Sequence, residues 1–268
     1  MNAEPNRQIL LAARPVGEPK PSDFDLVEKN IPTPGDEEVL CKTIYLSLDP
    51  YMRGRMNDTK TYAEPVAIGG VMEGGTVSRV VSSKNDAFRE GDIVVARTGW
   101  QDYAVTPGSQ LRKVDPGLAP ISTAIGVLGM PGMTAYTGLL NIGKPQPGET
   151  VVVAAASGAV GSIVGQIAKI KGCKVVGLAG SSEKCEYVKE KFGFDACLNH
   201  RDADVAAQLS KACNNGIDVY FENVGGAVWE AVLPLFNMFA RVPVCGLISH
   251  YNATSLPSAP NRVPELMF

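Results

Sequence analysis

The sequence predicts an α/β chain in which a small β-rich domain precedes a doubly wound domain built on a parallel sheet. Up to about residue 120, short β-branched runs alternate with glycine-containing turns, as in a compact β domain. From residue 121 onward, apolar strands alternate with helix-like segments. Near residue 158, an apolar run ends in a glycine turn that opens a helix. We assign residues 1–123 to the first domain and 124–268 to the second.

In the first domain we expect four strands, at residues 39–46, 71–81, 93–96 and 103–105. Each of these runs is rich in β-branched residues and is bounded by turn residues. Paired glycines stand before the second run, at 69–70, and inside it, at 74–75, as expected where strands bend sharply around a barrel.

The second domain has a regular alternation of strands and helices. It begins with helix-like spacing over residues 125–140, which we expect Pro131 and Gly132 to split. We expect strands at 151–155, 174–178, 196–198, 218–222 and 241–245, and helices at 160–171, 183–192, 203–213 and 228–235. Five strands with crossover helices predict a parallel sheet that binds ligands at the carboxyl ends of its strands.

Composition excludes several classes of partner. The 268 residues carry a formal net charge of -3, so no basic excess is present to bind nucleic acid or an anionic membrane surface. The first residues lack a signal peptide, and no apolar run reaches the roughly 18 residues of a membrane span. The 6 cysteines form no C-x-x-C pair. We therefore expect a cytoplasmic protein with reduced thiols.

The glycine turn is typical of a dinucleotide site. Gly158 lets the backbone approach a pyrophosphate, and Gly161 lets the helix pack closely on the strand, while Ala156 stands where the pattern has its first glycine. The N–H groups of Ala159 and Val160 open the helix, whose positive end attracts phosphate. A tight turn without a ligand is the alternative interpretation.

The tip of the next strand favours NADPH over NADH. About twenty residues beyond the glycine turn, an NAD site has an acidic residue that binds the ribose. This chain has Gly180, Ser181 and Ser182 there, followed by Lys184, and these groups can donate to an extra phosphate. The alternative is that Ser182 caps the helix and Lys184 is a solvated surface charge.

Four segments together resemble one family, the zinc-independent medium-chain dehydrogenases/reductases: residues 45–56, 155–161, 222–226 and 245–252. The resemblance covers essentially the whole chain and is strongest to the branch of curcumin, prostaglandin and plant double-bond reductases. It implies a GroES-like β-barrel domain, a Rossmann domain, and NADPH-dependent reduction of the C=C bond of α,β-unsaturated ketones and aldehydes. A quinone reductase and a catalytically weak NADPH-binding protein stay open as alternatives.

The resemblance also bears on metals. Zinc relatives carry a cysteine ligand near residues 48–50 and a His–Glu pair near residues 71–73, and neither set is present here. Both histidines, His200 and His250, lie in the second half. We therefore expect no metal, and the carbonyl oxygen of a substrate needs another hydrogen-bond donor.

Two tyrosines are candidate catalytic residues. Tyr251 follows the fifth strand of the second domain, and the matching tyrosine of related reductases contacts the cofactor near the nicotinamide ribose. Tyr51 stands in the first domain where zinc relatives have a ligand, and its neutral phenol can donate to a carbonyl. Packing in a loop or core is the alternative role for each.

Further cofactor contacts are implied by the family. Asn223 fits a contact to the cofactor ribose, and His200 stands where relatives have a tyrosine near the adenosine phosphate. The remaining expected contacts follow the fifth strand and are Cys245, Gly246, Leu247, Ile248 and Ser249.

Complete relatives run well past residue 268, so we expect a sixth strand and a loop over the nicotinamide to lie outside this chain. In the family the sixth strand commonly pairs across a dimer axis, which implies a homodimer at full length. Without that strand, residues 241–245 would form an exposed sheet edge.

Overall fold

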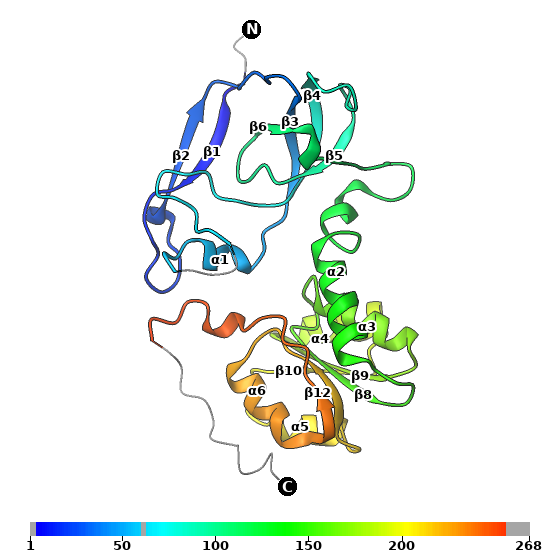
Figure 1. The fold of residues 1–268 in the computed structure, drawn as a ribbon. Helices are drawn as coiled ribbons and strands as arrows, with labels where there is room; N and C mark the ends of the chain where they lie inside the picture. The colour runs from blue at the N-terminus through cyan, green and yellow to red at the C-terminus, as the bar shows by residue number, and fades with distance from the viewer. Residues whose placement is uncertain (1–3, 60–62, 256–268) are drawn as a thin grey trace. The chain divides into compact units, whose positions relative to one another are not determined.

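A computed structural model describes residues 4–59 and 63–255 (Figure 1). The chain divides into two units, Met1–Gly129 and Met130–Phe268. The domain limits of 1–123 and 124–268 stay predictions, and each unit is described by itself. No helix in the described part of the chain combines the length and the apolar character needed to cross a bilayer.

The first unit is built from antiparallel strands. One sheet has the order β6-β3-β4-β5-β7, and β1 pairs with β2 in a second. The strands are β1 (Asn6–Leu11), β2 (Phe24–Lys29), β3 (Glu38–Leu46), β4 (Thr76–Ser83), β5 (Ile93–Ala96), β6 (Tyr103–Pro107) and β7 (Arg112–Lys113). The helical segments are α1 (Tyr51–Arg55) and three 3₁₀ turns, Pro21–Asp23, Gly108–Gln110 and Ile121–Ile125.

The strand predicted over residues 71–81 begins only at Thr76. Before it, the chain leaves the sheet and pairs with β1, since Met72 N–H donates to Ile9 O at 3.0 Å. Gly74 allows this crossing, because a Cβ there would lie 2.6 Å from the side chain of Leu46. The first residues of the predicted strand therefore form a loop held against β1.

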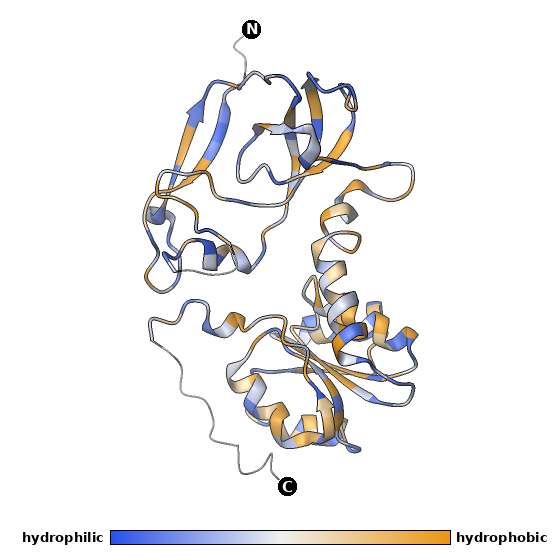
Figure 2. Ribbon diagram, viewed as in Figure 1, coloured by the Kyte–Doolittle hydropathy of each residue, from blue (hydrophilic) through white to orange (hydrophobic). Residues whose placement is uncertain are grey.

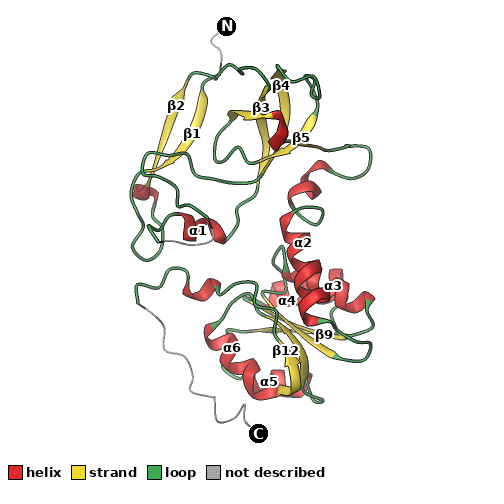
Figure 3. Cartoon of the chain, in the orientation of Figure 1, coloured by secondary structure: helices red, strands yellow, loops and turns green. Residues whose placement is uncertain are grey.

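The second unit contains a parallel sheet, whose strands are yellow in Figure 3, and the strand order is β10-β9-β8-β11-β12. Its strands are β8 (Thr150–Ala154), β9 (Lys174–Ala179), β10 (Ala196–Asn199), β11 (Ile217–Phe221) and β12 (Phe236–Arg241). Its helices are α2 (Met130–Thr137), α3 (Gly161–Ile170), α4 (Ser182–Phe192), α5 (Val205–Ala212) and α6 (Gly226–Val232). The predicted α/β class with a Rossmann-like parallel sheet is confirmed. Strand order reverses between β8 and β11, and this is where such sheets bind ligands.

Both faces of the parallel sheet are buried. Alternate residues of β8 serve different cores: Val151 and Val153 pack with α3, whereas Val152 and Ala154 pack with α5 and α6. Apolar residues therefore fill the strand after Thr150, and orange predominates along the strands of this sheet in Figure 2. Because both faces are buried, the sequences of the central strands are almost entirely apolar and do not alternate with polar residues.

The helix predicted over residues 125–140 is not split at Pro131. Helix α2 begins at Met130, so Pro131 lies in the first turn. N–H groups of the first turn have no acceptor within the helix, so a proline there breaks no hydrogen bond. After Thr137 the chain continues as a π-helical turn, Gly138–Gly143.

The strand predicted at residues 241–245 is wrong. The fifth strand is β12 (Phe236–Arg241), and its pairing with β11 is interrupted by a register shift. Pro243 cannot donate to the ladder, and the pairing beyond it is an isolated bridge between Glu222 and Val244. Residues 242–255 are therefore mostly loop.

Candidate cofactor and active site

The turn between β8 and α3 depends on close backbone contacts. Ala155 adopts a left-handed φ of 51°, and its carbonyl oxygen accepts from Gly158 N–H at 2.8 Å. A Cβ on Gly161 would lie 2.3 Å from that same oxygen, and one on Gly158 would lie 3.1 Å from it. Both glycines are therefore required for the turn to pass this close to the strand.

The strained residue of this turn is Ala155, one position before the place where the sequence pattern has its substituted glycine. Ala156 is fully buried, and its methyl group would lie 2.7 Å from a Cβ on Gly177. The alanine thus fills a space that Gly177 of β9 leaves open. The missing first glycine is accommodated by packing.

The beginning of α3 presents N–H groups that have no carbonyl one turn earlier to bond. Val160 is the residue before the helix, Ala159 is exposed, and Ser162 N–H already donates to Gly158 O at 3.0 Å. Close packing fixes the helix, since a Cβ on Gly165 would lie 1.9 Å from the ring of Phe194. This end of α3 is suited to bind a phosphate group.

A side chain bridges the point where strand order reverses. Asn223, which follows β11, donates through Nδ2 to Ala154 O at the end of β8, at 2.8 Å. Before it, the buried Glu222 accepts from the N–H groups of Val224 and Gly225, at 2.6 and 2.9 Å. The turn after β11 is thereby held beside the turn after β8.

The loop after β12 lies on the turn that follows β11. Cys245 N–H donates to Glu222 O at 2.9 Å, and Ser249 N–H donates to Val224 O at 3.0 Å. Farther along, Ile248 N–H donates to the carbonyl oxygen of residue 223 at 3.3 Å. The predicted cofactor residues 245–249 and Asn223 therefore form one surface at the carboxyl ends of the sheet.

Tyr251 closes this loop on itself. Its hydroxyl accepts a long hydrogen bond from Leu247 N–H at 3.4 Å. A Cβ on Gly246 would lie 2.7 Å from the hydroxyl, so Gly246 leaves room for the phenol. The half-buried Tyr251 thus belongs to the same surface as Asn223.

The end of β9 brings together the residues predicted to bind an additional phosphate. Ser181 caps α4 by accepting from Lys184 N–H at 3.3 Å. The cap is therefore Ser181 rather than Ser182, which is exposed in the first turn together with Lys184. The imidazole of His200 lies beside Gly180, since its Nε2 would be 3.5 Å from a Cβ there.

Arg201, which was not among the predicted site residues, lies at the same place. Its guanidinium Nη2 would lie 3.8 Å from the same Cβ on Gly180, next to the imidazole of His200. The family resemblance that indicated His200 gives no role to the next residue. Only the shape of the turn after β10 brings the Arg201 side chain to this place.

Tyr51 belongs to the first unit, where it begins α1. The buried Arg55 lies over its ring, with Cζ 5.7 Å from the centroid, and Arg55 Nε donates to Glu73 Oε1 at 2.6 Å. Burial raises the pKa of the Tyr51 phenol, and the Arg97 guanidinium within hydrogen-bonding reach acts in the opposite direction. The phenol is a neutral donor.

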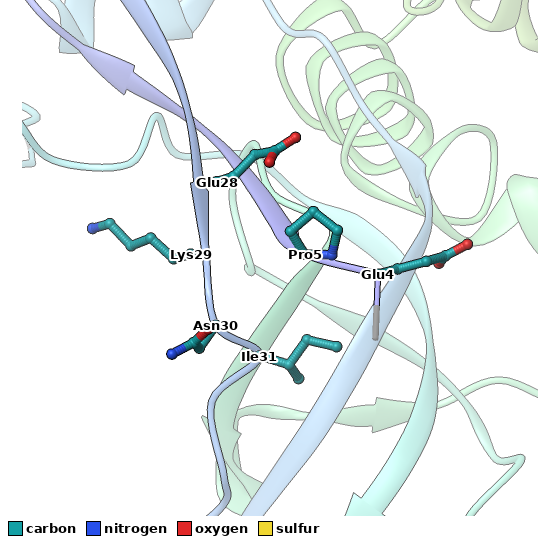
Figure 4. A pocket seen from close by; sticks show the side chains of 6 residues that line it. All are labelled: Glu4, Pro5, Glu28, Lys29, Asn30 and Ile31. Carbon is teal, nitrogen blue, oxygen red and sulfur yellow. The ribbon is translucent and has the colours of Figure 1, made fainter. Parts of the chain in front are cut away.

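Two depressions in the first unit contain none of the predicted site residues. One of about 760 Å³, shown in Figure 4, is lined by Glu4, Pro5, Glu28, Lys29, Asn30 and Ile31. The other, of about 380 Å³, is lined by Arg7, Ile9, Leu26, Thr43, Ile44, Leu46, Trp100, Gln101 and Asp102. Because neither includes a residue predicted to bind the cofactor or to act in catalysis, neither is the candidate site.

Comparison with known proteins agrees with this geometry. A family model described as the N-terminal domain of oxidoreductase matches residues 7–114, and one described as zinc-binding dehydrogenase matches residues 159–263. The NADPH-dependent curcumin reductase of Escherichia coli (strain K12) is 58% identical, over 98% of this chain and 76% of that protein. The chain belongs to the medium-chain dehydrogenase/reductase family.

Other members of the medium-chain dehydrogenase/reductase family are also similar. The NADP(+)-dependent 2-alkenal reductase of Nicotiana tabacum is 45% identical over 92% of this chain and 74% of that protein. The crystal structure of CurA from Vibrio vulnificus in complex with NADPH matches with a TM-score of 0.92 and 57% identity. That match covers 97% of this chain and 77% of the other. The match extends over both units.

Zinc is bound by some members of the medium-chain dehydrogenase/reductase family. Within residues 4–59 and 63–255, no group of three or more His, Cys, Asp or Glu side chains is arranged to hold a metal ion. At the place where zinc relatives have a His–Glu pair, the described residues contain Glu73 in an ion pair with Arg55.

Proposed function

We propose that this chain reduces the C=C bond of α,β-unsaturated ketones and aldehydes, including curcumin-like enones, with NADPH as the hydride donor. The main structural support for the proposal is the hydrogen bond from Asn223 Nδ2 to Ala154 O. It joins the glycine turn after β8 to the turn after β11 at the switch point of a Rossmann-like sheet. Similarity to the curcumin and 2-alkenal reductases supports the substrate class.

The residues of the second unit fit a dinucleotide phosphate. The turn at Gly158 and Gly161 packs on Ala155 O and leads directly into the N-terminus of α3, whose free N–H groups suit a phosphate. We assign the pyrophosphate to Gly158, Ala159, Val160 and Gly161, and the 2′-phosphate to Ser182, Lys184 and His200. The nicotinamide ribose is assigned to Asn223, Cys245, Gly246, Leu247, Ile248, Ser249 and Tyr251. When bound, NADPH supplies a hydride.

The remaining task of the protein is to stabilise and protonate the reduced substrate. Addition of hydride to the β-carbon of an enone leaves an enolate, whose oxygen needs a hydrogen-bond donor and whose α-carbon needs a proton. We assign these roles to the phenols of Tyr251 and Tyr51. The products are the saturated ketone and NADP⁺.

Replacing Tyr251 with Phe is expected to lower kcat with an enone by about a hundredfold, because it removes the proposed donor. Removing the hydroxyl deletes one long hydrogen bond to Leu247, so the circular dichroism spectrum should not change. Tyr51→Phe tests the second phenol. Tyr187→Phe, at an exposed position of α4, is the matched control. A wild-type rate in Tyr251→Phe would remove Tyr251 from the chemistry.

Lys184→Ala is expected to weaken NADPH binding by about tenfold or more and NADH binding by less than about twofold. Only NADPH offers a phosphate to this exposed ammonium group. Lys191→Ala, on the last turn of the same helix, is the matched control. Affinities are measured by fluorescence titration, and equal losses for both cofactors would refute the assignment.

The function itself is tested with purified protein, NADPH and two kinds of acceptor. We expect oxidation of NADPH by a conjugated enone, and a product two hydrogen atoms heavier that keeps its carbonyl group. Turnover with a quinone alone would point to a quinone reductase. Binding of NADPH without turnover of either acceptor would point to a catalytically weak binding protein.

We propose a homodimer at full length as the assembly, with the cytoplasm as its location. Support for the dimer comes from β12 at the edge of the described sheet, where Met238 and Phe239 are 79% and 86% exposed. Exposed apolar edge strands favour pairing with another chain. Light scattering of the purified protein should give twice the mass of the chain, and the mass of one chain would refute the dimer.

A further inference from the structure

We infer that Arg201 is a second cation for the 2′-phosphate of NADPH and so helps to set the preference for NADPH over NADH. The inference rests on the proposed function, because it requires that this chain bind a nicotinamide dinucleotide. It adds to Lys184 and His200 a residue that neither the sequence pattern nor the family resemblance indicated.

The turn after β10 fixes the backbone of Arg201. Asn199 holds this turn in two ways, since its Oδ1 accepts from Arg201 N–H at 3.2 Å and its Nδ2 donates to Asp202 at 2.7 Å. His200 N–H donates to Ala179 O at 3.0 Å, which ties the turn to the end of β9. The two side chains therefore start from a backbone that is anchored at both ends.

The side chains of His200 and Arg201 converge on the end of β9. Measured from the position that a Cβ on Gly180 would occupy, His200 Nε2 lies at 3.5 Å and Arg201 Nη2 at 3.8 Å. Gly180 is followed directly by Ser181, the cap of α4, and by the first turn of that helix with Lys184. An imidazole, a guanidinium and the positive end of a helix thus surround one short segment of backbone.

Arg201 has no ion-pair partner in the described part of the chain. The two nearest acids along the chain have other partners: Asp202 accepts from Asn199 at 2.7 Å, and Asp204 accepts from Gln208 at 2.6 Å. The guanidinium is exposed and available to an anion from solution.

The chemistry of the guanidinium decides which anion fits. Its planar fork of N–H groups matches two oxygens of one phosphate, and such charge-assisted pairs are stronger than neutral hydrogen bonds. NADPH has a phosphate on the adenosine ribose where NADH has a hydroxyl group. Arg201 therefore stabilises bound NADPH selectively and leaves the pyrophosphate and nicotinamide contacts unchanged.

The experiment uses the full chain and equilibrium binding, without turnover. Dissociation constants are measured by fluorescence titration for NADPH and NADH, and by calorimetry for 2′,5′-ADP and 5′-AMP. Arg201→Ala is expected to weaken NADPH and 2′,5′-ADP by about tenfold to a hundredfold, and NADH and 5′-AMP by less than about twofold. Arg201→Lys, which keeps the charge but loses the fork, should lie between wild type and Arg201→Ala.

Arg112→Ala is the matched control, because Arg112 is an exposed arginine on β7 of the first unit. An unchanged affinity of Arg201→Ala for NADPH, or equal losses for NADPH and NADH, would overturn the inference while leaving the proposed function intact. Failure of the wild-type chain to bind NADPH would overturn both.

Discussion

Gly161→Ala is expected to weaken NADPH binding by at least about a hundredfold. A Cβ at this position would lie 2.3 Å from Ala155 O and 3.1 Å from Ala156 Cα, so backbone atoms of the turn after β8 would have to move. The start of α3 would shift away from the pyrophosphate. Loss of two charge-assisted hydrogen bonds, at about 1.5 kcal/mol each or more, gives the stated factor.

The same substitution should also destabilise the fold. Overpacking a close contact costs about 1–3 kcal/mol in the free energy of unfolding, which urea denaturation measures. Gly75→Ala is the control, because a Cβ on Gly75 meets nothing within 4 Å. Wild-type affinity for NADPH in Gly161→Ala would show that the turn does not hold the pyrophosphate.

Glu222→Ala is expected to lower the free energy of unfolding by about 2–5 kcal/mol. Glu222 is 1% exposed and accepts from the N–H groups of Val224 and Gly225, which the alanine would leave buried without an acceptor. The turn that presents Asn223 would loosen as well, so the affinity for NADPH should fall together with stability.

Glu222→Gln separates hydrogen bonding from charge at this position. The glutamine keeps a carbonyl oxygen that can accept from both N–H groups, so we expect a loss no larger than about half that of the alanine variant. Burial, followed by the nearby Glu222 carboxylate, raises the pKa of Tyr220, which therefore stays neutral beside either residue. Equal destabilisation by alanine and glutamine would contradict the acceptor role of Glu222.

The central strands of the parallel sheet were predictable because both faces are buried. Residues 151–155 are apolar throughout and residues 175–178 contain no polar side chain, and the structure places β8 and β9 within one residue of the predicted limits. The edge strand β12 was mislocated because it mixes exposed and half-buried residues, and Phe239 has a φ of 64°. Periodicity gives little information where one edge of a strand has no partner.

The backbone conformation of the glycine turn and the positions of some side chains at the site could not be predicted from the sequence. The pattern has its first glycine at the position of Ala156, whereas the left-handed residue is Ala155, because the pattern compares residue types and not dihedral angles. The position of the Arg201 side chain could not be predicted from the sequence for a similar reason. Its direction depends on the turn that Asn199 stabilises, and no spacing rule predicts that turn.

In the proposed reaction, the chain transfers hydride from NADPH to the β-carbon of an enone. The most direct test uses NADPH deuterated at the transferred position and a conjugated enone, with the product analysed by NMR. We predict one deuterium on the β-carbon, a proton from water on the α-carbon and an intact carbonyl group. Deuterium on the carbonyl carbon of an allylic alcohol, or none in the product, would contradict the account.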